Sequence, residues 1–289
     1  MAWSVLQSNG SFSDTWATST TLSYLNNVSA GTKLVAYTMV FGNVTVTAVK
    51  DAALNAMTKL GSAAPAGSAT NGEFAIWAMD TPAGDAGIKP AMLPTFSTGT
   101  TSALSMVVQE VSGLLTGNTS AMLDGALASS NGTISTSGSV ACGAYSSAAA
   151  GEFLVAAAAD DESAGIATYG TPAGSTTYAL DAHAQNATNS TNNVPASGLA
   201  TGGAETASFG VTLSGTSVKW VTLFGAFKLA PAGGSAAAQM REHAGRRKGR
   251  RHGARSQQQQ ASFAAAPAST VLPVILVTPP VAVSDGSAW

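Results

Sequence analysis

Charged residues, cysteine and histidine are all scarce in this sequence. Only 10% of its 289 residues are charged, whereas an average globular chain has about 25%. The one cysteine, Cys142, excludes an intramolecular disulfide and a thiolate cage for a metal. Two of the three histidines lie in a basic stretch, which argues against a histidine-rich metal centre. We therefore expect neither a metal nor a cofactor.

Long apolar runs are missing as well. The N-terminus has no basic segment followed by an apolar run, so it does not resemble a secretory signal. Prolines at positions 273, 279 and 280 interrupt the longest apolar run, residues 271–281, which is much shorter than the ~20 residues of a membrane-spanning helix. We expect a protein that is made in the cytoplasm and does not insert into a membrane.

Apolar and small residues make up for these absences. Apolar residues account for 45% of the chain, and there are 31 glycines. A chain of this length removes about three quarters of its unfolded surface from water when it folds. It can therefore bury a sizeable core and is not disordered throughout.

The cations are concentrated in one short segment. Residues 1–240 carry six lysines and no arginine against thirteen acids, a net charge of −7, and residues 256–289 carry only Asp285. Residues 241–255 carry six arginines and Lys248 against Glu242, a net charge of +6, so the three segments sum to −2. The acidic body makes nucleic acid an unexpected partner, and any polyanion must bind the basic segment.

The first 230 residues predict an all-β fold. Runs rich in β-branched and aromatic residues alternate with segments rich in Gly, Pro, Ser and Thr, which is typical of an antiparallel sandwich or barrel. Between the first two runs, Gly42 and Asn43 predict a two-residue hairpin turn. The helix-like stretch at 52–57 is too short to predict a helix. The predicted strands are residues 33–41, 44–47, 73–79, 102–110, 152–158, 176–182, 204–214 and 217–229.

Large apolar residues predict the core. The last predicted strand is apolar on both faces, which indicates a central position in its sheet. Two strings recur at unequal spacings, Gly-Glu-Phe from 72 and 151 and Thr-Pro-Ala-Gly from 81 and 171, and we interpret them as two similar sheet edges rather than a repeat. The expected core anchors are Trp3, Leu34, Tyr37, Phe74, Trp77, Leu104, Met106, Phe153, Trp220, Phe224 and Phe227.

Composition divides the chain into three parts. Residues 1–230 are predicted to form the β-sandwich domain. Residues 231–261 are predicted to form a flexible linker that is rich first in Gly and Ala, then in Arg, and then in Gln. Residues 262–289 are predicted to form an apolar, extended arm that is broken by prolines.

Glu73 and Glu110 are the candidates for acid–base catalysis. Both lie on predicted strands, and sandwich folds host glycosidases that use two carboxylic acids. The sequence around Glu110, however, offers no aromatic residue that could stack on a sugar. We therefore favour a carboxylate at a strand end that accepts hydrogen bonds from loop N–H groups, and we expect no enzyme activity.

Three further features are weaker candidates. Asp160, Asp161 and Glu162 could contribute to a calcium site, but adjacent acids after a strand are more often a solvated turn. His183, between two alanines, is interpreted as an ordinary core or surface histidine. Cys142 is interpreted as a small buried hydrophobe.

The basic segment has three interpretations. It could bind a polyanion through phosphates, it could be a solvated linker, or it could dock into an acidic groove of a partner subunit. We favour the third, although a basic run is unspecific by itself. The residues concerned are Arg246, Arg247, Lys248, Arg250 and Arg251.

The apolar arm is more informative than the basic segment. Its prolines exclude a helix, and its apolar side chains would be an aggregation liability in water. It therefore predicts an extended segment that binds another chain, and the alternative is that it folds back onto its own sandwich. The linker before it is long enough to reach a neighbour. The predicted contact residues are Val271, Leu272, Val274, Ile275, Leu276 and Val277.

Several segments of the body are similar, in pattern and order, to a known family. They are AWSVLQS (2–8), AGTKLVA (30–36), VTVTAVKD (44–51), IWAMDTPA (76–83), QEVSGL (109–114), GEFLV (151–155) and FGAFKL (224–229). Together they resemble a family of actinobacteriophage minor tail proteins. The resemblance covers residues 1–230 and implies a jelly-roll-like sandwich with a structural role in the virion. It implies no active-site residues.

These observations predict an all-β protein, an antiparallel jelly-roll-like β-sandwich with an extended C-terminal arm. We expect a virion structural protein, assembled in the host cytoplasm, with other virion proteins and copies of itself as partners. A minor tail or tail-tip position is favoured over capsid decoration or a head spike. The alternative classes are a carbohydrate-binding module for host envelope glycans and a glycan-cleaving enzyme that uses Glu110.

Overall fold

In the computed structural model, contacts divide the chain into two units, Met1–Ala237 and Ala238–Trp289. The predicted basic segment and the predicted arm both fall in the second unit and lie outside the described residues, so the fold below is that of the first unit. The structure describes residues 2–16, 21–40, 42, 44–66, 72–97, 102–117, 121–160, 165–184, 192–215 and 217–231.

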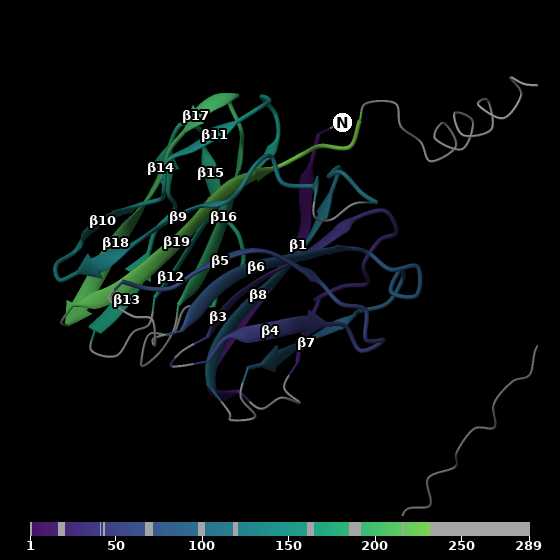
Figure 1. Cartoon of the computed structure of the whole chain (residues 1–289), viewed down its shortest axis with the longest axis horizontal. Helices are drawn as coiled ribbons and strands as arrows, with labels where there is room; N and C mark the ends of the chain where they lie inside the picture. The colour runs from purple at the N-terminus through teal and green to yellow at the C-terminus, as the bar shows by residue number, and fades with distance from the viewer. Residues whose placement is uncertain are drawn as a thin grey trace, which may run out of the picture. The chain divides into compact units, whose positions relative to one another are not determined.

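The described residues form antiparallel sheets and contain no α-helix, which confirms the predicted all-β class (Figure 1). The first half of the unit makes one lobe with two sheets. Its inner sheet has five strands, in the order β1 (Ser4–Trp16), β8 (Ser102–Ser112), β3 (Lys33–Val40), β6 (Glu73–Asp80) and β5 (Thr58–Ala63). Its outer sheet has three, in the order β2 (Leu22–Ser23), β7 (Ala91–Phe96) and β4 (Val46–Lys50).

The second half makes another lobe. The inner sheet runs β15 (Tyr178–Leu180), β16 (Asn193–Leu199), β12 (Phe153–Asp160), β19 (Val218–Phe227) and β9 (Ala128–Ile134). The outer sheet runs β10 (Gly138–Ala141), β18 (Ala207–Gly215) and β13 (Gly165–Tyr169), with β14 (Ala173–Gly174) also paired to β18. A small ladder joins β11 (Tyr145–Ser147) to β17 (Gly203–Glu205).

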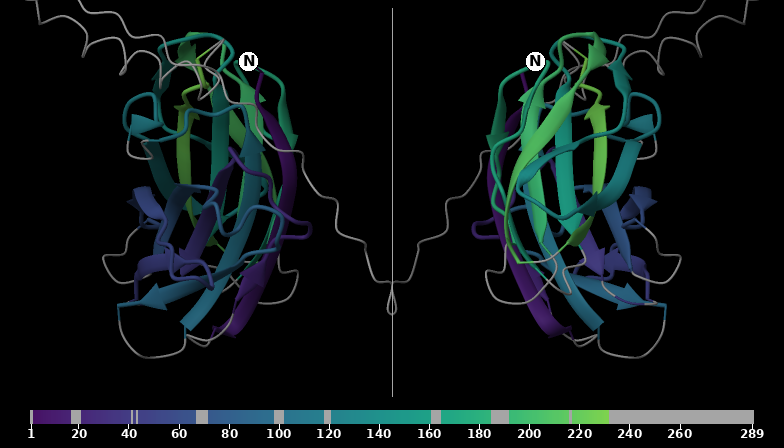
Figure 2. Two further views of the ribbon diagram at one scale, coloured as in Figure 1. Left: turned by 90° about the vertical axis from the view of Figure 1, so that its right-hand side faces the viewer. Right: turned by 90° about the vertical axis from the view of Figure 1, so that its left-hand side faces the viewer.

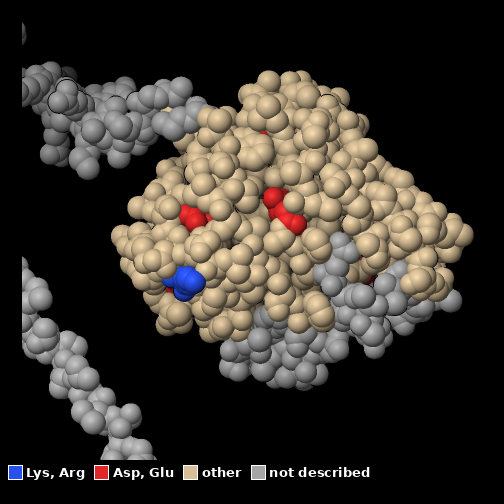
Figure 3. Space-filling model, turned by 180° about the vertical axis from the view of Figure 1, so that it is seen from behind, with Lys and Arg blue, Asp and Glu red and all other residues tan. Residues whose placement is uncertain are grey.

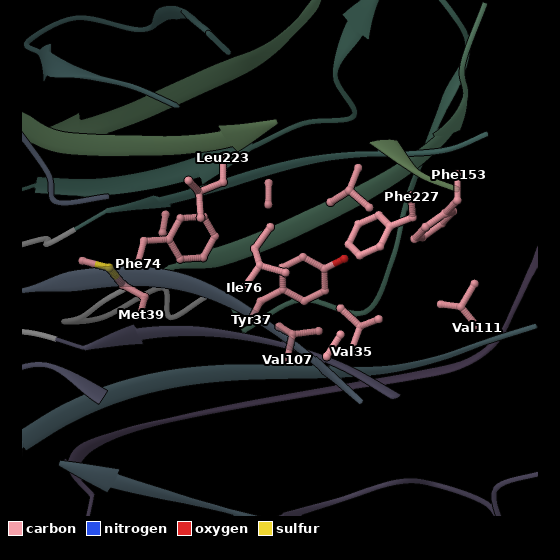
Figure 4. Packing of buried hydrophobic residues seen from close by; sticks show 14 of the residues in the cluster. Val35, Tyr37, Met39, Phe74, Ile76, Val107, Val111, Phe153, Leu223 and Phe227 are labelled. Carbon is pink, nitrogen blue, oxygen red and sulfur yellow. The ribbon is translucent and has the colours of Figure 1, made fainter. Parts of the chain in front are cut away.

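The four larger sheets stack in layers around three apolar clusters (Figure 2). The central cluster lies between the two inner sheets, where side chains such as Tyr37 and Ile76 meet Phe153, Leu223 and Phe227 (Figure 4). The other two clusters lie between each inner sheet and its own outer sheet. Because both faces of an inner sheet are covered, all eight residues of β3 and of β12 are buried. This explains why these strands consist mostly of apolar residues.

The two lobes have the same strand order. Each of these strands in the first lobe has a counterpart in the second lobe, both in chain order and in position in its sheet. In the inner sheets the counterparts are β1 and β9, β8 and β19, β3 and β12, β6 and β16, and β5 and β15. In the outer sheets they are β2 and β10, β7 and β18, and β4 and β13. Sequence segments repeat at matching places: AGTKLVA (30–36) and AGEFLVA (150–156) lead into β3 and β12. SNGSF (8–12) and SNGTI (130–134) lie in β1 and β9. The lobes are therefore two copies of one architecture.

The inner sheets face each other in opposite order. On β9, Asn131 Nδ2 donates to the carbonyl of Ala64 just after β5 (3.0 Å), and the amide of Ala182, just after β15, donates to Ser8 Oγ on β1 (3.1 Å). Each lobe's first strand thus lies against the far edge of the other lobe's inner sheet. A two-fold axis that lies between the two inner sheets and is parallel to their strands would superpose one lobe on the other. The two lobes are therefore related like the subunits of a symmetric dimer.

Both lobes place three of their connections at the same end of the unit. There the rings of Trp3 and Phe153 pack edge to face with centroids 4.7 Å apart. At the same end Leu114 and Leu229, which follow β8 and β19, form a bridge between the lobes. We call this the loop end, and it comprises loops 24–32, 51–57 and 81–90 of the first lobe and loops 142–152, 170–177 and 200–206 of the second.

The predicted core is largely confirmed. Nine of the eleven expected anchors are buried, and Trp3 and Trp220 are half-buried. The last strand, β19, pairs with β12 on one side and β9 on the other, as its two apolar faces predict.

The predicted hairpin at Gly42 and Asn43 is wrong. Gly42 does have a positive φ of 81°, but β3 and β4 do not pair, and they belong to the inner and outer sheets of the first lobe. The turn therefore carries the chain from one layer to the other, because Val40 and Val46 contribute to the same cluster from opposite sides.

Candidate functional site

The basic segment and the apolar arm named from the sequence lie outside the described residues. The prediction that they bind a partner therefore stays a prediction. The described residues do include Glu73, Glu110, Cys142 and His183.

The structure separates the two candidate catalytic acids. In the ladders of β3, Glu73 is opposite Val40 and Glu110 is opposite Leu34. These positions are six residues apart along one strand, which is about 20 Å, whereas the two carboxylates of a glycosidase lie about 5–10 Å apart. Glu73 and Glu110 cannot act as one acid–base pair.

Glu110 is a buried acceptor, as the sequence indicated. Its Oε1 accepts the amide of Ser29 (2.7 Å) and the hydroxyl of Thr32 (3.1 Å), and its Oε2 accepts Gln7 Nε2 (2.6 Å). The carboxylate thereby holds loop 24–32 against β1 and β8. Glu73 has a different role, since it pairs with Lys59 Nζ at 2.7 Å.

The other candidates do not form a cation site among the described residues. Asp160 is buried and accepts Asn192 Nδ2 at 2.9 Å, while Asp161 and Glu162 lie outside the described part of the chain. In that part, no three His, Cys, Asp or Glu side chains are grouped as a metal would need. No helix within it is long and apolar enough to cross a membrane.

His183 and Cys142 behave as ordinary residues. His183 is exposed, and its Nδ1 lies 3.4 Å from the carbonyl of Asp181. Cys142 is half-buried, and burial raises the pKa of its thiol to about 12, although a hydrogen bond to Thr222 opposes this. A thiol with so high a pKa is a poor nucleophile at neutral pH.

The loop end gathers buried carboxyl groups that the sequence did not single out. In the second lobe, Glu205 binds all three loops: it accepts the hydroxyls of Ser147 (2.7 Å) and Ser175 (2.6 Å) and the amides of Thr201 (2.7 Å) and Gly202 (3.2 Å). Burial by itself would raise the pKa of Glu205, but these hydrogen bonds outweigh it and hold the pKa below its ordinary value. Glu205 is therefore an ionised structural acceptor.

Two further carboxyl groups of the loop end are buried near another acid. Asp85, in loop 81–90, lies near Asp51, and Glu152, at the end of loop 142–152, lies near Asp124. Burial and the neighbouring acid raise the pKa of Asp85 to about 6 and that of Glu152 to about 7. Asp85 and Glu152 therefore gain a proton at a higher pH than an ordinary carboxyl group does.

A shallow hollow opens beside Glu205. Its volume is about 450 Å³, and it lies where the β10–β18 ladder gives way to the β11–β17 ladder. The oxygens of Glu205 are already occupied by loop donors, so they offer little to a ligand. The lining residues are Ala141, Cys142, Gly143, Ala144, Tyr145, Ala173, Ala204, Glu205, Thr206, Ala207 and Ser208.

The surface is poor in charge and in aromatic groups. Charged side chains are few on the face shown in Figure 3. Among the large apolar side chains that the described residues expose, Phe12 is the one aromatic, so the described surface presents no row of rings on which sugars could stack. The exposed large apolar residues are Leu6, Phe12, Leu25, Leu54, Ile88 and Leu199.

The fold and these contacts define an all-β protein of paired antiparallel sandwiches whose buried acids bind its own loops. No family model, no curated protein and no solved structure matches the chain.

Proposed function

We propose that this protein is a non-enzymatic structural component of a phage virion, displayed as a rigid body and anchored by its C-terminal arm. A minor tail or tail-tip position is favoured, and capsid decoration or a head spike is the alternative. The sequence resemblance of residues 1–230 supports the virion role. The strand order of each eight-strand lobe supports a jelly-roll assignment, in which eight strands form two sheets.

The division of the chain is the observation that carries this proposal. The core layers are built from residues 3–229. The second unit, Ala238–Trp289, contains seven of the thirteen cations and the whole apolar strip. The core layers of the body contain no residue of that strip. An extended apolar strip can bind by adding to a partner's sheet or by lying in a partner's groove.

The carboxylates of the body support a role without catalysis. Glu110 and Glu205 have their oxygens occupied by donors from their own loops, and Glu73 is paired with Lys59. The scarcity of exposed aromatic rings makes a carbohydrate-binding module the weaker candidate.

Assembly into particles tests the proposal. The full chain is compared with a variant carrying Val274→Asp, Ile275→Asp and Leu276→Asp, and with the control Leu54→Asp, which places one charge on an exposed loop of the body. The triple variant should remain soluble and folded but be absent from purified particles, because charged side chains cannot enter an apolar groove. The control should be incorporated normally. Normal incorporation of the triple variant would reject the anchoring role of the arm.

A further inference from the structure

We propose that the first-lobe loops of the loop end bind the surface of an anionic membrane through three exposed aliphatic side chains. These are Leu25, Leu54 and Ile88, one from each of the three loops, and we call them the apolar tips. The contact is peripheral, because the tips would enter only the headgroup region and no segment would cross the bilayer. This inference concerns the body alone and does not depend on the proposed virion role.

The order of the outer sheet brings the three loops side by side. Strand β7 lies between β2 and β4, so the loop that enters β7 lies between the loops that leave β2 and β4. Backbone hydrogen bonds join two of the loops directly. The amide of Val28 donates to the carbonyl of Ile88 (2.8 Å), and the amide of Tyr24 donates to the carbonyl of Pro90 (3.2 Å). Three of the six large apolar side chains that the described residues expose therefore lie at one end of one lobe.

Leu54 is the most exposed apolar tip, and its backbone conformation is unfavourable for a leucine. Its side chain is 72% exposed, and its φ of 68° lies in the left-handed region, which suits glycine or asparagine. The turn is nevertheless fixed, because the amides of Leu54 and Asn55 donate to the carbonyl and to Oδ1 of Asp51 (3.0 and 2.7 Å). A side chain that is both exposed and conformationally costly contributes little to folding, so it indicates a contact outside the body.

The second lobe shows that the architecture does not require these aliphatic side chains. The corresponding loops are 142–152, 170–177 and 200–206, and the structure describes all of their residues. None of the exposed large apolar residues lies in them. Because both lobes have the same strand order, the apolar tips are a property of the first-lobe loops rather than of the fold.

The charges of the first-lobe loops suit an anionic surface. The loops contain two acids, Asp51 and Asp85, and both are buried, whereas their one lysine, Lys89, is exposed. Asp80, just before loop 81–90, is paired with Lys33 at 2.5 Å. The exposed surface of the loops therefore carries one positive charge and no negative charge. A lysine at a membrane surface is attracted to anionic headgroups, while neighbouring aliphatic side chains enter the boundary with the acyl chains.

The composition of the loops favours a lipid surface over a protein partner. Protein interfaces depend on Tyr, Trp and Arg, and leucine is under-represented among the residues that dominate their binding energy. Besides the apolar tips and Lys89, the exposed residues of these loops are only Ala, Gly, Asn and Ser, and the one aromatic residue, Tyr24, is buried. Three tips on separate loops need no matching pocket to enter a lipid surface, because the lipids adapt to their shape.

Co-sedimentation of the full chain with lipid vesicles tests the proposal. The vesicles contain equal parts of phosphatidylcholine and phosphatidylglycerol, and about 0.5 M salt screens the attraction of the basic segment for them. The unmodified chain should bind. The tip variant, with Leu25→Asn, Leu54→Asn and Ile88→Asn, should bind about tenfold or more weakly, because these side chains lose their burial in lipid.

A second series separates the tips from the rest of the chain. The comparison is repeated with Val274→Asp, Ile275→Asp and Leu276→Asp in both proteins, so that the arm does not contribute to binding. At about 0.15 M salt, Lys89→Gln should weaken binding to these vesicles by about fivefold, the effect of one cation at an anionic surface. The same substitution should not change binding to vesicles of phosphatidylcholine alone.

Two controls distinguish a contact with lipid from a structural role. Phe12→Asn removes a partly exposed ring of β1 that lies five residues, about 17 Å, beyond Gln7, the residue that bonds to loop 24–32, so it should not change vesicle binding. Leu54→Asn alone should weaken binding but keep or raise the midpoint of thermal unfolding, because asparagine tolerates the left-handed conformation. A structural role of Leu54 would lower that midpoint instead.

Several outcomes would overturn the proposal. The first is an unmodified chain that does not bind the vesicles, and the second is a tip variant that binds as well as its parent in both series. Lys89→Gln without effect on the mixed vesicles would contradict the anionic character of the surface. A folded tip variant that is missing from purified particles would assign the tips to another virion protein and equally reject the lipid contact.

Discussion

At the scale of single residues, this protein uses its few acids as connectors between loops. Four of the buried acids fall into two kinds that follow from the groups around them. Glu110 and Glu205 accept several N–H and O–H groups, which stabilise the ionised form and offset the cost of burial. Burial and a neighbouring acid raise the pKa of Asp85 and Glu152, so both hold a proton more readily than an ordinary carboxyl group.

The stability of the body should depend strongly on Glu205. Glu205→Ala removes the acceptor of several buried donors, and we expect it to lower the free energy of unfolding by about 3 kcal/mol at pH 7. Because the pKa of Glu205 is lower in the folded than in the unfolded chain, the stabilisation is complete above about 4.5 and is lost as the pH falls below it. Denaturant titrations at pH 7 and pH 3 measure this difference, which should shrink at pH 3.

Glu73→Ala is the matched control for that measurement. Glu73 shares its charge with the partly exposed Lys59, and such an ion pair contributes about 1 kcal/mol or less. A loss for Glu205→Ala no larger than that of Glu73→Ala would show that Glu205 does not hold the loops.

At the scale of elements, the same short sequence serves two different structures. Thr-Pro-Ala-Gly ends at Gly84 in a loop and at Gly174 in β14. A methyl group on Gly84 would meet no atom within 4 Å, whereas on Gly174 it would lie 1.8 Å from the carbonyl oxygen of Thr206. β14 can pair with β18 only because this glycine lets the two backbones approach.

Alanine substitutions at the two glycines should therefore have opposite effects. Gly174→Ala should lower the free energy of unfolding by about 1–3 kcal/mol, because β14 must move away from β18. Gly84→Ala should be neutral or stabilise by about 0.5 kcal/mol, because it restricts the unfolded chain without a clash. Thermal and denaturant unfolding of both variants measure the contrast. Equal effects at the two positions would contradict the close approach of β14.

The sequence predicted five long inner-sheet strands that do not lie at a sheet edge, and it missed several others. β3, β6, β8, β12 and β19 agree with predicted runs because their own residues fill the core. β9 (ASSNGTI) and β16 (NVPASGL) consist mostly of residues with low strand preference, and β16 contains Pro195. They are strands because pairing with β19 and β12 decides their conformation, which no local pattern reveals.

The recurring string Gly-Glu-Phe did not reveal that the two lobes are copies of one architecture. Gly-Glu-Phe leads into β6 and β12, which do not correspond, since β12 corresponds to β3. Two other strings were informative. AGxxLVA, where x is any residue, begins at residues 30 and 150, and SNG begins at residues 8 and 130, so the copies are 120 and 122 residues apart. Of the buried acids, the sequence identified only the role of Glu110. Asp85, Glu152 and Glu205 had no local signal, because the loops that supply their partners are distant in sequence.

At the scale of the whole body, the two lobes depend on each other. The inner faces of both five-stranded sheets are apolar and cover one another, and Phe153 lies in this layer between Trp3 and Phe227, with centroids 4.7 and 5.6 Å away. A lobe without its neighbour would expose that face to water. Bridges such as Leu123–Phe227 also join the connection between the lobes to the last strand.

The body should therefore unfold in one cooperative transition rather than lobe by lobe, with equal calorimetric and van't Hoff enthalpies. Phe153→Ala should lower the free energy of unfolding by about 3–5 kcal/mol and shift the whole transition, since the cavity it leaves lies in the layer that both lobes share. Phe12→Ala, at a partly exposed ring of β1, should cost about 1 kcal/mol and is the control. Two resolved transitions in the unmodified protein would mean that the lobes are independent, and the shared layer would then be an ordinary domain contact.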